Sequence, residues 1–230
     1  MRINHNNINK SWYISQMKSD LKYLEKEKLD SIKEIASKIK RPNIIELGVH
    51  HGHSTSMFLD VCEKNDGYLT SIDIKDDSSV SNSKKWKFIL SSDDNFEYIG
   101  KLLQNKFDIL YIDSLHEAKH IEKVFYFYFN FVKVGGLIIV DDLVWLPYTK
   151  NSVKDNSFVE NTNRQIFYKI LEIYNSNIEN LTLNIDFQGS GLGFLKKKKE
   201  KLYKCKRIIS REYSIKNILK KLIYSPHPRI

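Results

Sequence analysis

One stretch constrains the fold of this chain more than any other, the segment IIELGVHHGHS from Ile44 to Ser54. It is an apolar strand that ends in an acid, Glu46, and turns through two glycines into a predicted helix. Gly48 permits a tight turn, and Gly52 lets the backbone approach a ligand because it has no Cβ. Ser54 is predicted to cap the helix. A loop of this kind between a strand and a helix predicts a site for a nucleotide-like ligand.

The length of 230 residues suits one α/β domain with short extensions. Hydrophobic residues make up 41% of the chain, which is typical of a globular protein, and no apolar run is long enough for a transmembrane segment. The N-terminus lacks the apolar segment of a secretory signal. The two cysteines, Cys62 and Cys205, fit a reducing compartment. We therefore expect a cytoplasmic protein without a disulfide framework.

Apolar runs alternate with helical patterns over most of the chain. Strands are predicted at 43–49, 68–73, 87–91, 107–112 and 136–141. Helices are predicted at 54–64, 94–104, 117–132 and about 164–175. The last two strands, 181–187 and 192–197, flank the hairpin signal Gly189-Ser190-Gly191. This order predicts an α/β fold with an open, mostly parallel sheet that ends in an antiparallel hairpin and carries helices on both faces.

Three parts are predicted along the chain: an N-terminal helical extension (1–40), one ligand-binding domain (41–197) and a basic C-terminal tail (198–230). The tail holds much of the net charge of +9 and carries isoleucines and leucines at helical spacing. One interpretation is a solvated helix that docks on the domain or on a partner subunit. The other is a basic amphipathic helix that contacts an anionic surface, either a membrane or a nucleic acid.

Acids stand at the carboxyl ends of three further predicted strands. Asp73 ends the second strand, Asp113 ends the strand at 107–112, and Asp141 and Asp142 follow the strand after that. In an open parallel sheet these ends face one crevice. Carboxylates at short distance repel one another unless a cation compensates them. The three acids Asp113, Asp141 and Asp142 therefore predict a hard divalent cation, Mg²⁺, Mn²⁺ or Ca²⁺.

The glycine loop and these strand ends resemble the class I S-adenosylmethionine (SAM) dependent methyltransferases. The spacing E-x-G-x-x-x-G differs from the dinucleotide fingerprint, which disfavours a nicotinamide dehydrogenase. The sequences IDSLH at 112–116 and VGGLIIVDD at 134–142 look like those of metal-associated small-molecule O-methyltransferases, the cephalosporin-hydroxylase-like and sugar or macrolide group. The resemblance covers roughly residues 40–197 and implies a Rossmann-like fold.

The resemblance also implies a role for individual residues. It implies that Asp113, Asp141 and Asp142 hold the metal, and that Asp113 and His116 are catalytic, with His116 as the base. Members of the group commonly read Asp-Gly-Asp-His here, so Leu115 replaces one acid of that loop. Asp73 would accept the ribose hydroxyls of SAM, and Ser92 and Asp93 would lie near the adenine amine. The implied cofactor-binding residues are Glu46, Gly48, Gly52, Ser54, Asp73, Ser92, Asp93 and Asp113.

The implied activity is methyl transfer from SAM to a hydroxyl oxygen of a small molecule, such as a sugar, polyol or natural product, with the help of a divalent metal. The acceptor pocket is expected between residues 143–163 and the N-terminal helices, where Trp12, Trp145 and Tyr148 offer flat apolar surfaces. The crowded histidines His50, His51 and His53 are interpreted as exposed or as shaping the pocket, because adjacent residues rarely ligate one ion.

Two other classes stay open. A nucleic-acid methyltransferase fits the basic tail, although the chain lacks the Asn/Asp-Pro-Pro-aromatic motif of amino-directed enzymes. A noncatalytic binding or assembly protein with a SAM-binding fold is the second class. The aromatic run FYFYF at 125–129 is predicted to pack in the core, or else to form the face of a homo-oligomer.

Overall fold

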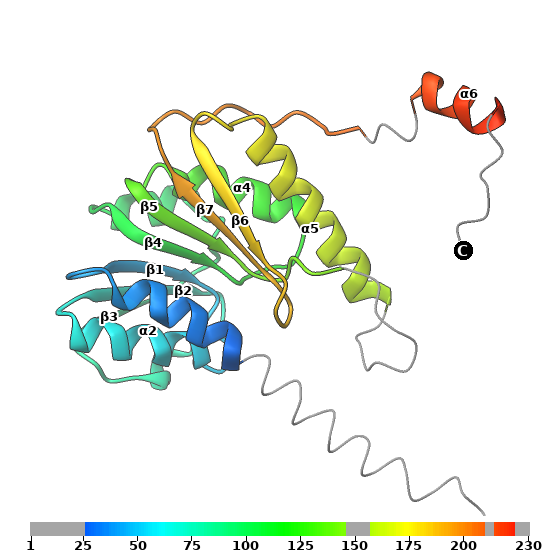
Figure 1. Ribbon diagram of the computed structural model, residues 1–230. Coiled ribbons are helices and arrows are strands. Elements are labelled where there is room, and N and C mark those ends of the chain that lie inside the picture. Colours follow the sequence, from blue (N-terminus) through cyan, green and yellow to red (C-terminus); the bar gives the residue numbers. More distant parts are fainter. Residues whose placement is uncertain (1–25, 146–156, 210–213, 224–230) are drawn as a thin grey trace, which may run out of the picture.

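The computed structural model describes residues 26–145, 157–209 and 214–223. Seven strands form one sheet in the order β3-β2-β1-β4-β5-β7-β6 (Figure 1). The strands are β1 (Asn43–Leu47), β2 (Tyr68–Asp73), β3 (Trp86–Leu90), β4 (Phe107–Ile112), β5 (Val132–Val140), β6 (Leu181–Asp186) and β7 (Leu192–Lys197). The first five strands are parallel, whereas β7 runs antiparallel to both β5 and β6. The predicted Rossmann-like fold with a terminal antiparallel hairpin is confirmed.

Helices cover both faces of the sheet. They are the helical segment 26–37, α2 (His53–Lys64), α3 (Phe96–Leu102), α4 (Ala118–Phe129), α5 (Ser157–Asn175) and α6 (Ile215–Ile223), with one short 3₁₀ turn, η1 (Ser78–Val80). Segment 26–37 and α2 pack on one face, and α3, α4 and α5 pack on the other. The predicted N-terminal helical positions before residue 26, and Pro147 and Tyr148, lie outside the described residues.

Side-chain alternation along β1 explains the two layers. Ile44 points into the core beneath α2, where it shares a cluster with Phe58. Ile45 and Leu47 point to the opposite face and join the cluster of α4 and α5. Because successive side chains of a strand face opposite sides, Glu46 is directed toward α2. The acid of the glycine loop is therefore a core residue by its place in the strand.

Three element boundaries differ from the sequence-based expectation by three residues or more, and several others differ by one or two. The helix predicted at 117–132 ends at Phe129, because Asn130 donates from its side chain to the carbonyls of Tyr126 and Phe127. Strand β5 then begins at Val132 rather than at 136, and its register shifts near Gly135, whose φ is +87°. Helix α5 begins at Ser157 rather than at about 164.

The chain after β7 stays attached to the domain as far as Ile208. The side chain of Asn177, just after α5, accepts from the amide of Tyr203 (2.7 Å) and donates to the carbonyl of Tyr203 (2.9 Å). The thiol of Cys205 donates to Glu122 on α4, and the amide of Lys206 donates to Ser176. The predicted boundary between the domain and the C-terminal tail, at 197/198, stays a prediction. These contacts favour a folded domain that extends to Ile208.

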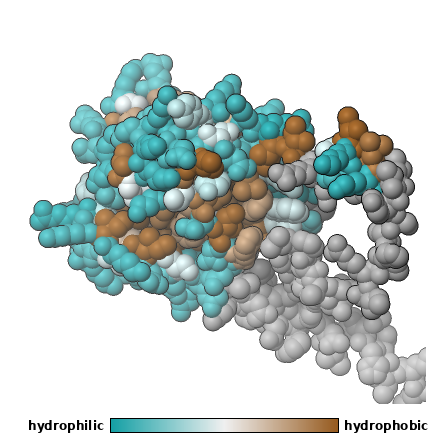
Figure 2. All heavy atoms as spheres, turned by 45° about the horizontal axis from the view of Figure 1, so that its top comes forward, coloured by the Kyte–Doolittle hydropathy of each residue, from teal (hydrophilic) through white to brown (hydrophobic). Residues whose placement is uncertain are grey.

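Helix α6 follows farther along and presents two kinds of side chain. Ile215, Ile218 and Leu219 are exposed on it, next to the basic Lys216 and Lys220. Figure 1 places α6 away from the sheet, and Figure 2 shows hydrophobic and hydrophilic atoms side by side on it. No helix within the described ranges is long and apolar enough to cross a membrane.

Truncation tests the extent of the domain. We expect a chain ending after Ile209 to unfold at the same temperature as the full chain. A chain ending after Lys199 should lose about 2–4 kcal/mol of unfolding free energy, because each lost hydrogen bond contributes roughly 1 kcal/mol. Thermal unfolding followed by circular dichroism measures both. Equal stability of the two truncated chains would place the boundary near 198 instead.

Candidate functional site

A cavity of about 540 Å³ opens at the carboxyl ends of the parallel strands. Ligands of open α/β sheets bind at this edge, and the volume is in the range of sites for small molecules. The walls come from the loops after β1, β2, β3 and β4, from the end of β2 and from the first turn of α4. They are Gly48, His50, Ile72, Asp73, Ile74, Lys75, Asp77, Ser92, Asp93, Asp94, Asp113, Ser114, Leu115, His116 and His120.

The two glycines of the loop serve different contacts. Gly48 lines the cavity with a φ of +94°, and a Cβ there would overlap the carbonyl oxygen of Asp113. Gly48 therefore lets the ends of β1 and β4 approach each other. Gly52 has a φ of +74° and leaves room for the side chain of Val80, so its missing Cβ serves packing. Gly52 does not line the cavity.

Glu46 lies beneath this loop, fully buried. Its carboxylate accepts from the hydroxyls of Ser54 (2.6 Å), Thr55 (2.7 Å) and Ser71 (2.6 Å). Burial raises its pKa to about 7, although these three hydroxyls oppose the shift. Ser54 therefore does not cap α2 as predicted, since Gly52 is the cap residue and the Ser54 hydroxyl is bonded to Glu46. Both residues support the loop from behind rather than lining the cavity.

Asp73, at the end of β2, is fixed by backbone amides. Its Oδ2 accepts from Val49 (2.7 Å) and His50 (3.3 Å), and its Oδ1 accepts from Lys75 (2.9 Å). Burial raises its pKa, but these amides outweigh burial and lower it, so the group is ionised at neutral pH. A carboxylate of fixed orientation on the cavity wall suits a pair of ligand hydroxyls.

The wall after β3 holds a second buried carboxylate. Asp93 accepts from the hydroxyl of Ser114 (2.6 Å) and contacts His120 Nε2 at 3.0 Å. The hydrogen bond to Asp93 raises the pKa of His120. Close by, Asp77 is 7% exposed, and its Oδ2 has no hydrogen-bond partner among the described residues. Sequence reasoning missed Asp77 and His120, although His120 lies one helical turn after His116.

The three acids predicted to hold a metal do come together. Tyr111 donates from its hydroxyl to Asp141 (2.6 Å) and lies 3.2 Å from Asp113. The ring nitrogens of His116 contact Asp113 Oδ1 (3.3 Å) and Asp142 Oδ2 (2.6 Å). A phenol and an imidazole thus link the acids into one cluster. Asp113 and His116 line the cavity, whereas Asp141 and Asp142 lie behind them.

A lysine and a hairpin serine complete the cluster. The ammonium of Lys28, from segment 26–37, lies 2.8 Å from Asp141 Oδ2 and 3.1 Å from Ser190 Oγ. Ser190, in the turn between β6 and β7, donates to Asp141 Oδ1 at 2.8 Å. Neither Lys28 nor Ser190 was foreseen, because a lysine at helical spacing and a serine in a turn carry no chemical signal in a sequence.

The pKa values follow from burial and these pairings. Burial and the nearby charge of Asp113 raise the pKa of Asp141 to about 6, against the influence of Lys28. Burial also acts on Asp142, but the hydrogen bond from His116 lowers its pKa. Hydrogen bonds to Asp113 and Asp142 raise the pKa of His116 to about 10. At neutral pH the cluster therefore holds carboxylates compensated by cationic side chains.

The arrangement does not fit a metal ion held by the three acids. Oxygens of each carboxylate already accept from, or pair with, Lys28, Tyr111, Ser190 or His116. Within the described part of the chain, no group of three or more His, Cys, Asp or Glu side chains is placed to hold a metal ion. This includes His50, His51 and His53, which are exposed.

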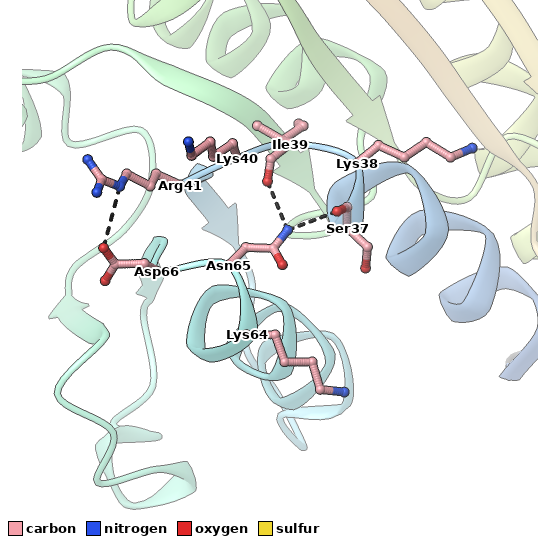
Figure 3. Close-up of a pocket in the computed structure, with 8 residues that line it drawn as sticks. All are labelled: Ser37, Lys38, Ile39, Lys40, Arg41, Lys64, Asn65 and Asp66. Atoms are coloured by element: carbon pink, nitrogen blue, oxygen red, sulfur yellow. Dashed lines mark hydrogen bonds and ion pairs between the residues drawn. The ribbon is translucent and has the colours of Figure 1, made fainter.

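A second hollow, of about 460 Å³, lies near the amino ends of the strands (Figure 3). The side chain of Asn65, after α2, donates to the carbonyls of Ser37 (2.8 Å) and Ile39 (2.9 Å). Arg41 faces Asp66 at 3.5 Å. These contacts attach the chain ahead of β1 to the end of α2, which is a structural role.

Residues 45–143 match the family described as "Methyltransferase domain". A comparison with curated proteins finds no match. The MycE methyltransferase of the mycinamycin biosynthetic pathway, solved with Mg, SAH and mycinamycin VI, is 18% identical, with a TM-score of 0.50 over 70% of this chain and 46% of that chain. The SAH-bound Podospora anserina methyltransferase PaMTH1 is 11% identical, with a TM-score of 0.60 over 86% and 100%. The O-methyltransferase TomG from Streptomyces achromogenes, solved with SAM, is 13% identical, with a TM-score of 0.54 over 74% and 79%.

The family match begins in β1 and ends just after Asp141 and Asp142, so it contains the whole cavity edge. The resemblance to the class I SAM-dependent methyltransferases is confirmed, because residues 45–143 match the methyltransferase-domain family. At identities below 20%, the solved structures show that the fold is shared. The chain covers less than half the length of the MycE chain.

Replacing Glu46 by Gln tests the buried carboxyl. The folded pKa of about 7 exceeds the ordinary 4.5, so the folded state keeps a proton that the unfolded chain loses, and wild-type stability falls as pH rises between these values. The uncharged Gln removes that dependence. We expect the stability of Glu46→Gln relative to wild type to rise by up to about 3 kcal/mol across this interval. Urea unfolding at several pH values measures it.

The matched control is Glu97→Gln, which removes an exposed acid of α3. Its stability relative to wild type should change little over the same pH interval. A Glu46→Gln difference that stays constant with pH would mean that Glu46 is ionised in the folded protein throughout.

Proposed function

We propose that this chain is a SAM-dependent methyltransferase that acts on a hydroxyl oxygen of a small molecule. The observation that carries the proposal is the cavity at the carboxyl edge, with Asp73 fixed at one side and Asp113 at the other, on a methyltransferase fold. MycE and TomG, which share the fold, are named for small-molecule pathways. The MycE complex also contains Mg, SAH and mycinamycin VI.

The cavity residues suit the parts of SAM. Asp73 would accept the ribose hydroxyls, because amides fix its carboxylate on the wall. The unpartnered oxygen of Asp77 offers a further acceptor on that side. Ser92 and Asp93 would face the adenine, and Gly48 leaves the backbone open to the ligand. When bound, SAM supplies a methyl group on a sulfonium, which passes to the acceptor oxygen and leaves SAH.

The acceptor side is proposed at Asp113 and His116. Asp113 has a partly exposed side chain on the cavity wall, which supports a role as the carboxylate that would take the hydroxyl proton. The assignment of His116 as the base stays a prediction. Both of its ring nitrogens contact carboxylates, which favours a role in positioning Asp113. Orientation of the hydroxyl is the main requirement of such a transfer.

Several other expectations stay untested. They are the divalent cation, the cytoplasmic location, the homo-oligomer and the contact of the basic tail with an anionic surface. The exposed isoleucines and lysines of α6 are compatible with that last contact and with a nucleic-acid substrate. The cavity edge favours the small molecule, because its walls are acidic at Asp73, Asp77, Asp93 and Asp113 and would repel a polyanion.

Calorimetry with SAM and SAH tests the cofactor assignment. We expect micromolar-range affinity, and Asp73→Ala should weaken it by about 1–3 kcal/mol because a charged acceptor of hydrogen bonds is lost. The control is Asp60→Ala, which removes an acid on α2 outside the cavity and should bind as the wild type does. Unchanged binding by Asp73→Ala would remove the ribose assignment.

Methyl transfer from labelled SAM to sugars, polyols and catechols tests the activity. We expect Asp113→Asn to lower the rate by about 10²-fold or more if Asp113 takes the proton. His116→Asn should lower the rate but preserve the pH profile, as a positioning role predicts. SAM binding without transfer to any acceptor would favour the noncatalytic class.

A further inference from the structure

The acid cluster behind the cavity contains a buried cation of the protein itself. Lys28 is 5% exposed and Asp141 is 3% exposed, and their charged atoms lie 2.8 Å apart. Lysine and aspartate are almost never fully buried unless they are paired. The two residues are separated by 113 positions in the sequence, so the fold brings segment 26–37 across the face of the sheet to the end of β5.

The groups around the Lys28 ammonium suit a cation. Ser190 accepts from Lys28 at 3.1 Å and donates to Asp141 at 2.8 Å, so the hairpin turn closes the pair on one side. Tyr111 donates to the same Asp141 oxygen that Lys28 contacts, and it is 1% exposed. The backbone amide of Asp142 donates to the other oxygen of Asp141 at 2.7 Å. Asp141 thus has donors on both of its oxygens.

The same cluster is where the sequence predicts a divalent cation. His116 occupies oxygens of Asp113 and Asp142, and Lys28 occupies an oxygen of Asp141. A metal ion that bound the three acids would have to displace both groups. Leu115 stands where the resembling group commonly has a further acid, so the cluster is also one negative ligand short.

We infer that Lys28 replaces the divalent cation at this cluster and that the protein does not bind a metal ion there. The ammonium of Lys28 supplies the positive charge that holds Asp141 near Asp113. Lys28 reaches from segment 26–37 and occupies the position where the metal ion would lie. The consequence for catalysis rests on the proposed function: methyl transfer would then proceed with Asp113 positioned by Tyr111 and His116, and chelators would not reduce the rate.

Metal binding by the purified full chain tests the inference without any need for turnover. Titration with Mn²⁺ followed by electron paramagnetic resonance, and thermal unfolding with and without millimolar Mg²⁺, are the two measurements. We expect no stoichiometric Mn²⁺ binding and no rise of the melting temperature for the wild type. Binding of one Mn²⁺ per chain that is lost in Asp141→Asn would overturn the inference.

The variant Lys28→Met tests whether removal of the ammonium allows a metal ion to bind. In this variant the three acids lack the positive charge of Lys28. We therefore expect the variant to gain Mn²⁺ binding and to be stabilised by Mg²⁺, with a melting temperature raised by about 2 °C or more. Potassium chloride at equal ionic strength should not have this effect. Adding Asp141→Asn to Lys28→Met should abolish the gain.

Lys33→Met is the matched control, because Lys33 lies on the same helical segment but pairs with the partly exposed Asp60 on α2. It should not gain metal binding. A folded Lys28→Met protein that binds no divalent cation would overturn the inference. Should that variant fail to fold, Lys28→Ala and the wild-type titration decide the question. Absence of SAM binding with these metal results intact would refute the proposed function and leave the inference standing.

Discussion

The buried carboxyl of Glu46 is the contact on which the cavity edge depends. It accepts hydrogen bonds from the hydroxyls of Ser54 and Thr55 on α2 and of Ser71 on β2. The hydroxyl of Ser71 in turn accepts a hydrogen bond from the indole of Trp86 on β3. Three strands and a helix are thereby tied to one group with no solvent contact. A buried carboxyl with fully paired oxygens fixes its partners in direction as well as distance. The glycine loop that forms the cavity wall rests on this set.

The second organising constraint is charge at the carboxyl edge. Parallel strands place Asp73, Asp113, Asp141 and Asp142 at one edge, and such a concentration of carboxylates is unfavourable unless each is compensated. Two kinds of contact compensate these carboxylates. Backbone amides surround Asp73, whereas cationic and hydroxyl side chains surround the other three. The backbone amides leave the carboxylate of Asp73 open to a ligand, whereas the side-chain contacts bury Asp141 and leave Asp113 and Asp142 partly exposed.

The fold was predictable because it depends on periodicity. Continuous apolar runs such as Ile109 to Ile112 predict buried parallel strands, and the Gly189 to Gly191 signal predicts the hairpin. The site was predictable only in part. Acids at strand ends follow from the same periodicity, but the roles of Glu46 and Ser54 depend on which face each side chain takes. The register of β1 turns Glu46 inward, so an acid expected to contact a ligand became a support for the loop.

Lys28 and Ser190 were beyond sequence reasoning for a different reason. Each joins the cluster through tertiary packing across a long separation in the chain, and neither belongs to the segments where the acids stand. A lysine in a polar helix is most often exposed to solvent, so the sequence around Lys28 favours an exposed side chain, whereas the structure buries it. Burial beside Asp141 gives it a partner and at the same time occupies an oxygen that a metal ion would need. The charge balance of the edge is therefore a property of the whole fold, and a motif of strand-end acids does not by itself specify which cation compensates them.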